Sequence, residues 1–197
     1  MATKPIVTPE LLRQLLDCDP ETGLLTWRRR SADLFRDTPA RTKDHACANW
    51  NARYAGKEAF TSVDGRGYRQ GAIFDRLYPA ARVIWAIETG EWPSGMIDHI
   101  NGNVSDNRMS NLREADYSEN ARNQGVRRNN TSGFKGVCWH GETQKWRARI
   151  VHQGRAQHLG YFDTETAAAQ AYDAAAQDTH GKFARVNFPR RQPHVSR

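Results

Sequence analysis

The spacing of apolar residues predicts two helices in the first ninety positions. A short amphipathic helix is expected from Pro9, because Thr8 is a capping residue, proline suits the first helical turn, and four leucines follow with helical spacing. A second helix is expected over residues 80–89, where apolar residues recur three and four positions apart and Gly90 provides a stop.

Shorter apolar runs predict strands around these helices. Residues 24–30, LLTWRRR, have the composition of a strand. Residues 58–63 and 67–74 are two further β-type runs joined by the turn sequence DGRG, so a hairpin is expected there. Residues 31–54 are too polar and irregular to assign.

The last third of the chain shows strict alternation. In KWRARIV, residues 145–151, one strand face carries Lys145, Arg147 and Arg149, and the other carries Trp146 and apolar residues. Similar runs before and after it predict three antiparallel strands. An alanine-rich helix follows, starting at Asp163 or Thr164 and ending at Gly181, and its small residues are expected to pack on the apolar face of the sheet. The residues expected in that core are Trp146, Ile150, Leu159, Phe162 and Phe188.

Charge separates this last third from the rest. Residues 1–126 hold 17 Lys/Arg and 17 Asp/Glu, whereas residues 127–197 hold 12 and 5, so the whole net charge of +7 lies at the C-terminal end. Such an excess favours a polyanionic partner such as nucleic acid, since lysine and arginine release the counterions condensed on phosphates. The alternative is a charged face that serves only solubility.

The cysteine spacing and the hydropathy of the chain indicate the cellular compartment. The three cysteines are far apart and lack the paired spacing of a zinc site, so reduced thiols are expected. No apolar run is long enough to span a bilayer, and the start of the chain lacks the apolar core of a signal peptide. We therefore expect a cytoplasmic protein without a membrane partner.

The polar stretch 97–120, IDHINGNVSDNRMSNLREADYSEN, contains five asparagines and little that could be buried. Two short strands are expected on either side of the turn-rich NGNVSDN, and Gly102 is suited to ending the first strand. Asp116 and Glu119 have the spacing of a capping box, which predicts a helix directly afterwards. The expected order is therefore strand, loop, strand, helix.

This order would bring Asn120, in the first turn of the helix, back towards Asp98 and His99. A carboxylate and an amide oxygen are hard ligands suited to Mg²⁺ or Mn²⁺. Histidine, with an ordinary pKa of about 6.5, can take a proton from an attacking water near neutral pH. Phosphodiester hydrolysis needs such a base and such a cation. The alternative is an asparagine-rich loop in which His99 only satisfies a backbone carbonyl.

The motif DHINGNVSDNRMSNL...SEN resembles the active-site motif of the HNH endonucleases, in particular the phage and intron-homing group. The resemblance implies a ββα-metal fold, with His99 as general base and Asp98 and Asn120 as ligands of Mg²⁺ or Mn²⁺. It also implies that Asn111, among the catalytic residues, braces the loop. Relatives often carry histidine at the position of Ala81, so a chain weakened at Ala81 is a further hypothesis.

Residues 132–189 resemble the APETALA2-type domain of plant ethylene-responsive factors, whose sheet docks in the major groove of DNA. The matching positions imply that Lys135, Arg147 and Arg149 lie on the DNA face. Arg155 is expected at the strand edge, and His140 and His158 are weaker candidates for DNA binding. Cys138, Val151 and Ala156 replace expected contact residues, so no target sequence is carried over.

Together these patterns predict an α+β protein: an HNH nuclease domain over 1–125, a linker at 126–131, a three-stranded antiparallel sheet packed on one helix over 132–189, and a tail at 190–197. The predicted function is metal-dependent cleavage of double-stranded DNA by a monomer, which would nick, or a homodimer. The setting would be the bacterial cytoplasm if the protein is phage-encoded. The alternative is a DNA-binding regulator that cleaves weakly or not at all.

Overall fold

The computed structural model describes residues 7–126 and 129–189. The chain divides into two compact units between Ala115 and Asp116, so the helix after the polar stretch belongs to the second unit rather than to the predicted domain 1–125. The predicted tail lies outside the described residues, as do residues 127 and 128 of the predicted linker. No helix in the described parts is long and apolar enough to cross a membrane.

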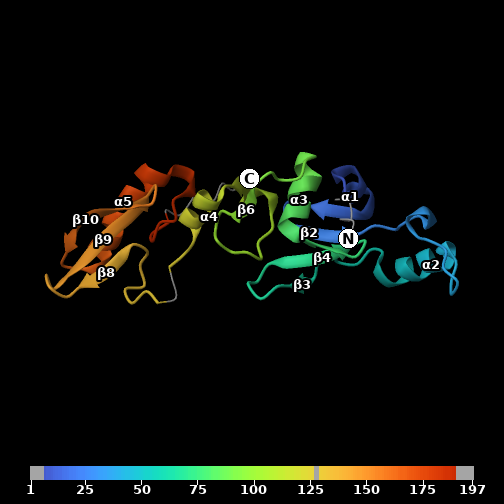
Figure 1. Cartoon of the computed structure of the whole chain (residues 1–197), viewed down its shortest axis with the longest axis horizontal. Coiled ribbons are helices and arrows are strands. Elements are labelled where there is room, and N and C mark those ends of the chain that lie inside the picture. The colour runs from blue at the N-terminus through green and yellow to red at the C-terminus, as the bar shows by residue number, and fades with distance from the viewer. Residues whose placement is uncertain (1–6, 127–128, 190–197) are drawn as a thin grey trace, which may run out of the picture. The chain divides into compact units, whose positions relative to one another are not determined.

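Short helices and two- or three-stranded sheets build the first unit (Figure 1). In chain order they are α1 (Pro9–Leu15), β1 (Leu16–Asp19), β2 (Leu24–Trp27), the 3₁₀ turn η1 (Ala32–Leu34), α2 (Lys43–Tyr54), β3 (Ser62–Val63), β4 (Arg69–Ile73), β5 (Arg76–Pro79), α3 (Ala80–Thr89), β6 (Met96–His99), η2 (Met109–Asn111) and β7 (Leu112–Ala115).

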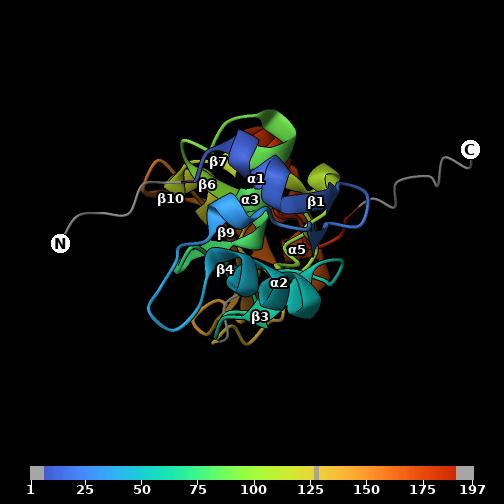
Figure 2. The same ribbon diagram turned by 90° about the vertical axis from the view of Figure 1, so that its right-hand side faces the viewer.

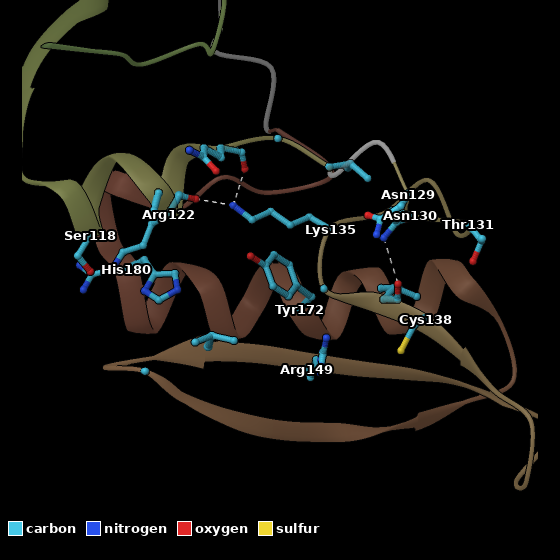
Figure 3. Close-up of a pocket in the computed structure, with 18 of the residues that line it drawn as sticks. Ser118, Arg122, Asn129, Asn130, Thr131, Lys135, Cys138, Arg149, Tyr172 and His180 are labelled. Carbon is cyan, nitrogen blue, oxygen red and sulfur yellow. Dashed lines mark hydrogen bonds between the residues drawn. The ribbon is translucent and has the colours of Figure 1, made fainter. Parts of the chain in front are cut away.

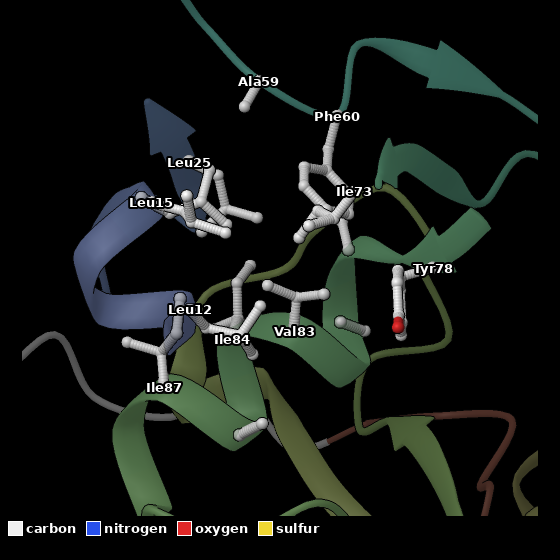
Figure 4. Packing of buried hydrophobic residues seen from close by; sticks show 14 of the residues in the cluster. Leu12, Leu15, Leu25, Ala59, Phe60, Ile73, Tyr78, Val83, Ile84 and Ile87 are labelled. Atoms are coloured by element: carbon white, nitrogen blue, oxygen red, sulfur yellow. The ribbon is translucent and has the colours of Figure 1, made fainter. Parts of the chain in front are cut away.

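The core of the first unit forms where α1 and α3 lie side by side (Figures 1 and 2). Thr8 caps α1 by accepting a hydrogen bond from the Leu11 amide at 3.3 Å, and Gly90, at φ +83°, closes α3. Figure 4 shows Leu12 of α1 beside Ile84 and Ile87 of α3. Both predicted helices are confirmed, because their apolar stripes face each other.

The apolar pattern did not predict helix α2 or the strands β1 and β5. Helix α2 buries only small or polar residues, Ala46, Cys47 and Asn51, so it has no apolar period to recognise. Strand β5 follows β4 through a two-residue turn in which Phe74 and Asp75 both have positive φ. Such turns favour Asn-Gly or Asp-Gly, so Phe-Asp is not a recognisable turn signal. The predicted hairpin of β3 and β4 is confirmed.

The second unit is a three-stranded antiparallel sheet with a helix packed on it (Figure 1). Its elements are α4 (Tyr117–Asn123), β8 (Val137–His140), β9 (Lys145–His152), β10 (Arg155–Phe162), α5 (Glu165–His180) and η3 (Gly181–Phe183), and the sheet order is β10-β9-β8. Small residues on α5, among them the fully buried Ala168 and Ala176, allow close packing on the sheet. The α+β class and this sheet-and-helix architecture are confirmed.

One predicted core residue lies elsewhere. Trp146, Leu159 and Phe162 pack against the buried cluster as expected, and Ile150 is 1% exposed. Phe188, in contrast, is 44% exposed, and its ring packs on that of Phe134 with centroids 5.5 Å apart. The alanine-rich helix already fills the space above the sheet, so Phe188 lies at the edge of the core.

Candidate active site and nucleic-acid interface

Strand β6 carries Asp98 and His99 at its end, and both are almost completely buried, at 4% and 3% exposure. The strand ends there because the chain turns: the Gly102 amide donates to the His99 carbonyl at 2.8 Å, and Gly102 has φ +73°. Both residues are paired within the regular ladder, in which neighbouring side chains point to opposite faces of the strand. The antiparallel partner is β7, with His99 opposite Leu112.

Asn111 fastens the loop between β6 and β7. Its Nδ2 donates to the Asp106 carbonyl at 2.8 Å and to Asn101 Oδ1 at 3.1 Å, and its Oδ1 accepts from the Asn101 amide at 3.0 Å. Each bond joins the end of the loop to its middle or start. Asn111 is itself 6% exposed, so these bonds satisfy a buried amide and keep the loop in one conformation.

A carboxylate in the same loop is held ionised. Asp106 accepts from Arg108 Nε at 2.8 Å and from Asn101 Nδ2 at 2.8 Å. The hydrogen bond from Arg108, followed by that from Asn101, lowers the pKa of Asp106 to about 2. Asp106 therefore stays charged and tightly bonded throughout the neutral range, which makes it a structural part of the loop.

The imidazole of His99 is oriented by a residue that the sequence did not single out. His99 Nε2 lies 3.1 Å from Asn107 Oδ1, and the Asn107 side chain is 3% exposed. With Oδ1 as acceptor, the proton resides on Nε2, and Nδ1 is the nitrogen with the lone pair. The Tyr68 ring packs on the imidazole with centroids 5.8 Å apart. In the sequence, Asn107 was one of five similar asparagines, so only its placement distinguishes it.

Asp98 forms a buried ion pair across the hairpin. Arg113 lies directly opposite it on β7, and its Nε and Nη2 both donate to Asp98 Oδ2, at 2.8 and 2.6 Å. The side chains are 5% and 13% exposed, so the pair is shielded from water. The arginine compensates the buried charge and fixes the direction of the carboxylate.

The hairpin alone supplies too few ligands to complete the coordination of a hard cation. No group of three or more His, Cys, Asp or Glu that could hold a metal ion occurs in residues 7–126 and 129–189. A cation at Asp98 would therefore be completed by amide, water or phosphate oxygens, as is usual for Mg²⁺. A carboxylate already directed by an arginine is compatible with such a site.

Asn120, the other predicted ligand, lies in the first turn of α4, which the second unit contains. Both bonds of the predicted capping box are present: the Glu119 amide donates to Asp116 Oδ1 at 2.7 Å, and the Asp116 amide donates to Glu119 Oε2 at 2.8 Å. Asp98, His99 and Asn111 thus all lie on the β6–β7 hairpin of the first unit, whereas Asn120 lies in the second unit.

Ala81 lies in the core rather than at a polar surface. It is 6% exposed and belongs to the buried cluster of the first unit. Its neighbour Arg82 donates to the carbonyls of Gly95, at 2.6 Å, and Pro93, at 3.0 Å. Arg82 therefore anchors the segment that leads into β6, and the hypothesis of a weakened site at Ala81 stays a prediction.

Three of the predicted DNA-binding residues share the sheet face opposite α5. In the register, Arg147 lies opposite Tyr161, and Arg149 lies opposite His158. The rings of His158 and Tyr161 pack with centroids 4.6 Å apart. Arg149 and His158 are exposed, whereas Arg147 is half-buried, with Nη2 3.4 Å from Cys138 Sγ. His140, the weaker candidate, packs against Tyr161 at 5.0 Å.

Two others lie away from this face. Arg155 is opposite His152, which has the strand parity of the helix-covered side. Lys135 is half-buried, and its Nζ donates to the carbonyls of Arg122 and Gln124 at the end of α4. Burial, followed by the nearby Arg185, lowers the pKa of Lys135 to about 8. Its ammonium group is therefore directed to α4, not to the exposed sheet face.

Comparison with known proteins agrees with this geometry. Residues 78–122, which include β6, β7 and most of α4, match the family described as HNH endonuclease. Protein 3.8 of Escherichia phage T7 is 34% identical over 116 residues, which are 57% of this chain and 95% of that protein. The chain belongs to the HNH endonuclease family. As a family member it is a nuclease.

Two more relatives are similar to the HNH endonuclease over part of their own length. The uncharacterized HNH endonuclease L560 of Acanthamoeba polyphaga mimivirus is 34% identical over 99 residues, half of each chain. The AP2-like ethylene-responsive transcription factor CRL5 of Oryza sativa subsp. japonica is 30% identical over 173 residues, 81% of this chain and 26% of that protein. The chain thus spans half or less of these two relatives.

Proposed function

We propose that this HNH endonuclease hydrolyses phosphodiester bonds of double-stranded DNA with one divalent cation, Mg²⁺ or Mn²⁺, and that the sheet β8–β10 holds the duplex. The observation that carries the proposal is the buried pair of Asp98 and His99 at the end of β6, with Nε2 of the imidazole bonded to Asn107. A buried base with a fixed tautomer is suited to proton abstraction.

In the proposed reaction His99 accepts the proton of a water molecule at Nδ1. The water oxygen forms the new bond to phosphorus, the bond to the 3′ oxygen breaks, and this oxygen takes up a proton from solvent, so that the products carry 5′-phosphate and 3′-hydroxyl ends. Asp98 and Asn120 are the proposed ligands of the cation, which would supply positive charge next to the phosphoryl oxygens and the leaving oxygen. Arg113 orients Asp98, Asn107 orients His99, and Asn111 braces the loop that follows both on the chain.

The exposed face of the sheet supports a separate role in binding. Arg147, Arg149 and His158 lie on one face, beside the tyrosine and histidine rings that pack there. A sheet of this width fits the major groove of DNA, and its cations would release counterions from the phosphates. We propose that these three residues contact DNA, with Arg155 and Lys135 outside this set.

A DNA-binding regulator without cleavage is the second candidate function. The observation that favours it is the Asp98–Arg113 pair, because the carboxylate is already neutralised by an internal cation. The relation to a phage protein supports, for either function, a phage-encoded protein that acts in the bacterial cytoplasm, as a monomer that nicks or as a homodimer.

Supercoiled plasmid distinguishes the two functions. We expect conversion to the nicked form with Mg²⁺ or Mn²⁺ and none with EDTA, and Asp98→Asn should abolish both the conversion and the binding of Mn²⁺ measured by electron paramagnetic resonance. Asp44→Asn, an exposed acid on α2, is the matched control. A wild-type protein that shifts DNA in a gel but neither binds Mn²⁺ nor nicks would establish the regulator instead.

A further inference from the structure

The second unit contains a cleft of about 560 Å³ to which the proposed function assigns no ligand (Figure 3). It is lined by α4, by residues 124–126 and 129–131, by Lys135–Cys138, by residues 149, 151, 153 and 154 of the sheet and its turn, and by residues of α5, and we call it the Lys135 cleft. This volume lies within the range of about 300–1,000 Å³ typical of small-ligand sites. None of the described residues that line it is Asp or Glu.

Lys135 is a fixed cation without a counter-ion in this cleft. Its backbone is locked by Asn187, whose Oδ1 accepts from the Lys135 amide at 2.7 Å and whose Nδ2 donates to the Lys135 carbonyl at 3.2 Å. Its Nζ donates to two carbonyls, those of Arg122 and Gln124, and no carboxylate of the described residues forms an ion pair with it. A half-buried charge neutralised only by carbonyl dipoles favours a bound anion.

Two side chains of α5 add hydrogen-bonding groups (Figure 3). His180 is 8% exposed, and its Nδ1 has no hydrogen-bond partner within the described residues. Tyr172 is held against Gly136, where a Cβ atom would lie 2.0 Å from the tyrosine ring. Burial, followed by Asp173, raises the pKa of Tyr172 to about 12, so the phenol keeps its proton and can donate.

The surroundings are positive rather than balanced. Burial, and then Arg122, His152 and Lys135 in that order, lower the pKa of His180, so the cleft disfavours a further positive charge on this imidazole. The carboxylate next to Tyr172 is already used: Asp173 accepts from Asn187 N at 2.7 Å, from Asn187 Nδ2 at 3.0 Å and from Phe188 N at 2.8 Å.

We propose that the Lys135 cleft binds a phosphate group, through the ammonium group of Lys135 and the hydroxyl of Tyr172. A phosphate has the charge that the cleft lacks and several acceptor oxygens for its donors. The site is distinct from the β6–β7 hairpin, and it borders the exposed sheet face at Arg149. The phosphate could come from the DNA backbone or from a free nucleotide, and only the first source depends on the proposed function.

The test uses the full-length protein in EDTA, so that binding is measured without metal-dependent cleavage. Tyr172→Phe keeps the ring against Gly136 and removes only the hydroxyl, and we expect about tenfold weaker binding of a phosphate-bearing ligand. Lys135→Met should also lower the slope of log affinity against log salt concentration for duplex DNA by about 1. Tyr54→Phe and Lys43→Met, both on α2 in the first unit, are the matched controls.

The two probes are a random 20-base-pair duplex, followed by fluorescence anisotropy, and deoxyadenosine monophosphate, followed by calorimetry. A loss confined to the duplex identifies a backbone phosphate, and a loss confined to the nucleotide identifies a free ligand. Unchanged binding of both probes by a stably folded Tyr172→Phe protein overturns the proposal. If Lys135→Met releases α4 and lowers the melting temperature, the result with Tyr172→Phe alone decides whether the cleft binds phosphate.

Discussion

The β6–β7 hairpin and the exposed face of the β8–β10 sheet use polar residues in opposite ways. In the hairpin, Asp98 and His99 are buried, and each has a neighbour that fixes it, Arg113 for the carboxylate and Asn107 for the imidazole. On the sheet, Arg149 and His158 are exposed. A buried group cannot exchange its partner for water, whereas an exposed cation can.

This difference predicts two patterns of sensitivity to mutation. A site made of buried, mutually oriented groups depends on each of them, since a vacated partner leaves another polar group unsatisfied. A surface made of exposed cations sums many weak, salt-dependent contributions. Substitutions should therefore produce large, salt-independent losses in the hairpin and small, salt-dependent losses on the sheet.

The largest effect is expected at the base. Replacing His99 with Ala should lower the rate of plasmid nicking by about 100- to 10,000-fold, the usual contribution of a general base, without weakening DNA binding. His45→Ala, at an exposed position on α2, controls for loss of a histidine. An equal rate for the two variants would refute the role of His99.

A smaller effect is expected at the residue that orients the base. Asn107→Leu keeps the volume but removes the acceptor of His99 Nε2, and we expect the nicking rate to fall by about 10- to 100-fold. Asn107→Asp restores an acceptor but favours the protonated imidazole, so its activity should recover at higher pH. Asn49→Ala, exposed on α2, is the control. If the Leu and Asp variants had the same pH profile, orientation by Asn107 would be excluded.

On the sheet, the register itself can be tested. Arg149→Ala should weaken duplex binding about fivefold to tenfold and lower the salt slope by about 0.9, because one phosphate contact is lost. Arg155→Ala, on the same sheet but with the other parity, should change the affinity by no more than about twofold. The measurement is fluorescence anisotropy at several salt concentrations. Equal losses of duplex affinity in Arg149→Ala and Arg155→Ala would show that DNA binding does not depend on which face of the sheet carries the arginine.

The smallest effect concerns pH and stability. Because Lys135 has a folded-state pKa of about 8, below the ordinary lysine value, the folded protein binds fewer protons than the unfolded chain between about pH 8 and 10. Stability should therefore rise with pH in this window, by on the order of 1 kcal/mol after allowance for partial exposure. Urea denaturation of the wild type and Lys135→Met should give diverging curves, with Lys43→Met as control. Parallel curves of stability against pH for the wild type and Lys135→Met would contradict the lowered pKa of Lys135.

The sequence by itself determined the elements with strong local signals. Helices α1 and α3, the capping box of α4 and the alternation in β9 all depend on residues within one or two turns or along one strand, so spacing alone reveals them. Helix α2 was not predicted because its buried residues are small or polar. Strand β5 was not predicted because Phe74 and Asp75 form a turn without a glycine.

Only the tertiary structure decided which polar groups meet. Arg113 pairs with Asp98 because the register of β6 and β7 places them opposite each other, and Asn107 reaches His99 because Asn111 folds the loop back. Lys135 shows the same limit: its position resembled a DNA contact, but its ammonium group lies on the end of α4. Local sequence fixes backbone conformation, whereas burial and cross-strand register, which depend on distant residues, choose each side chain's partner.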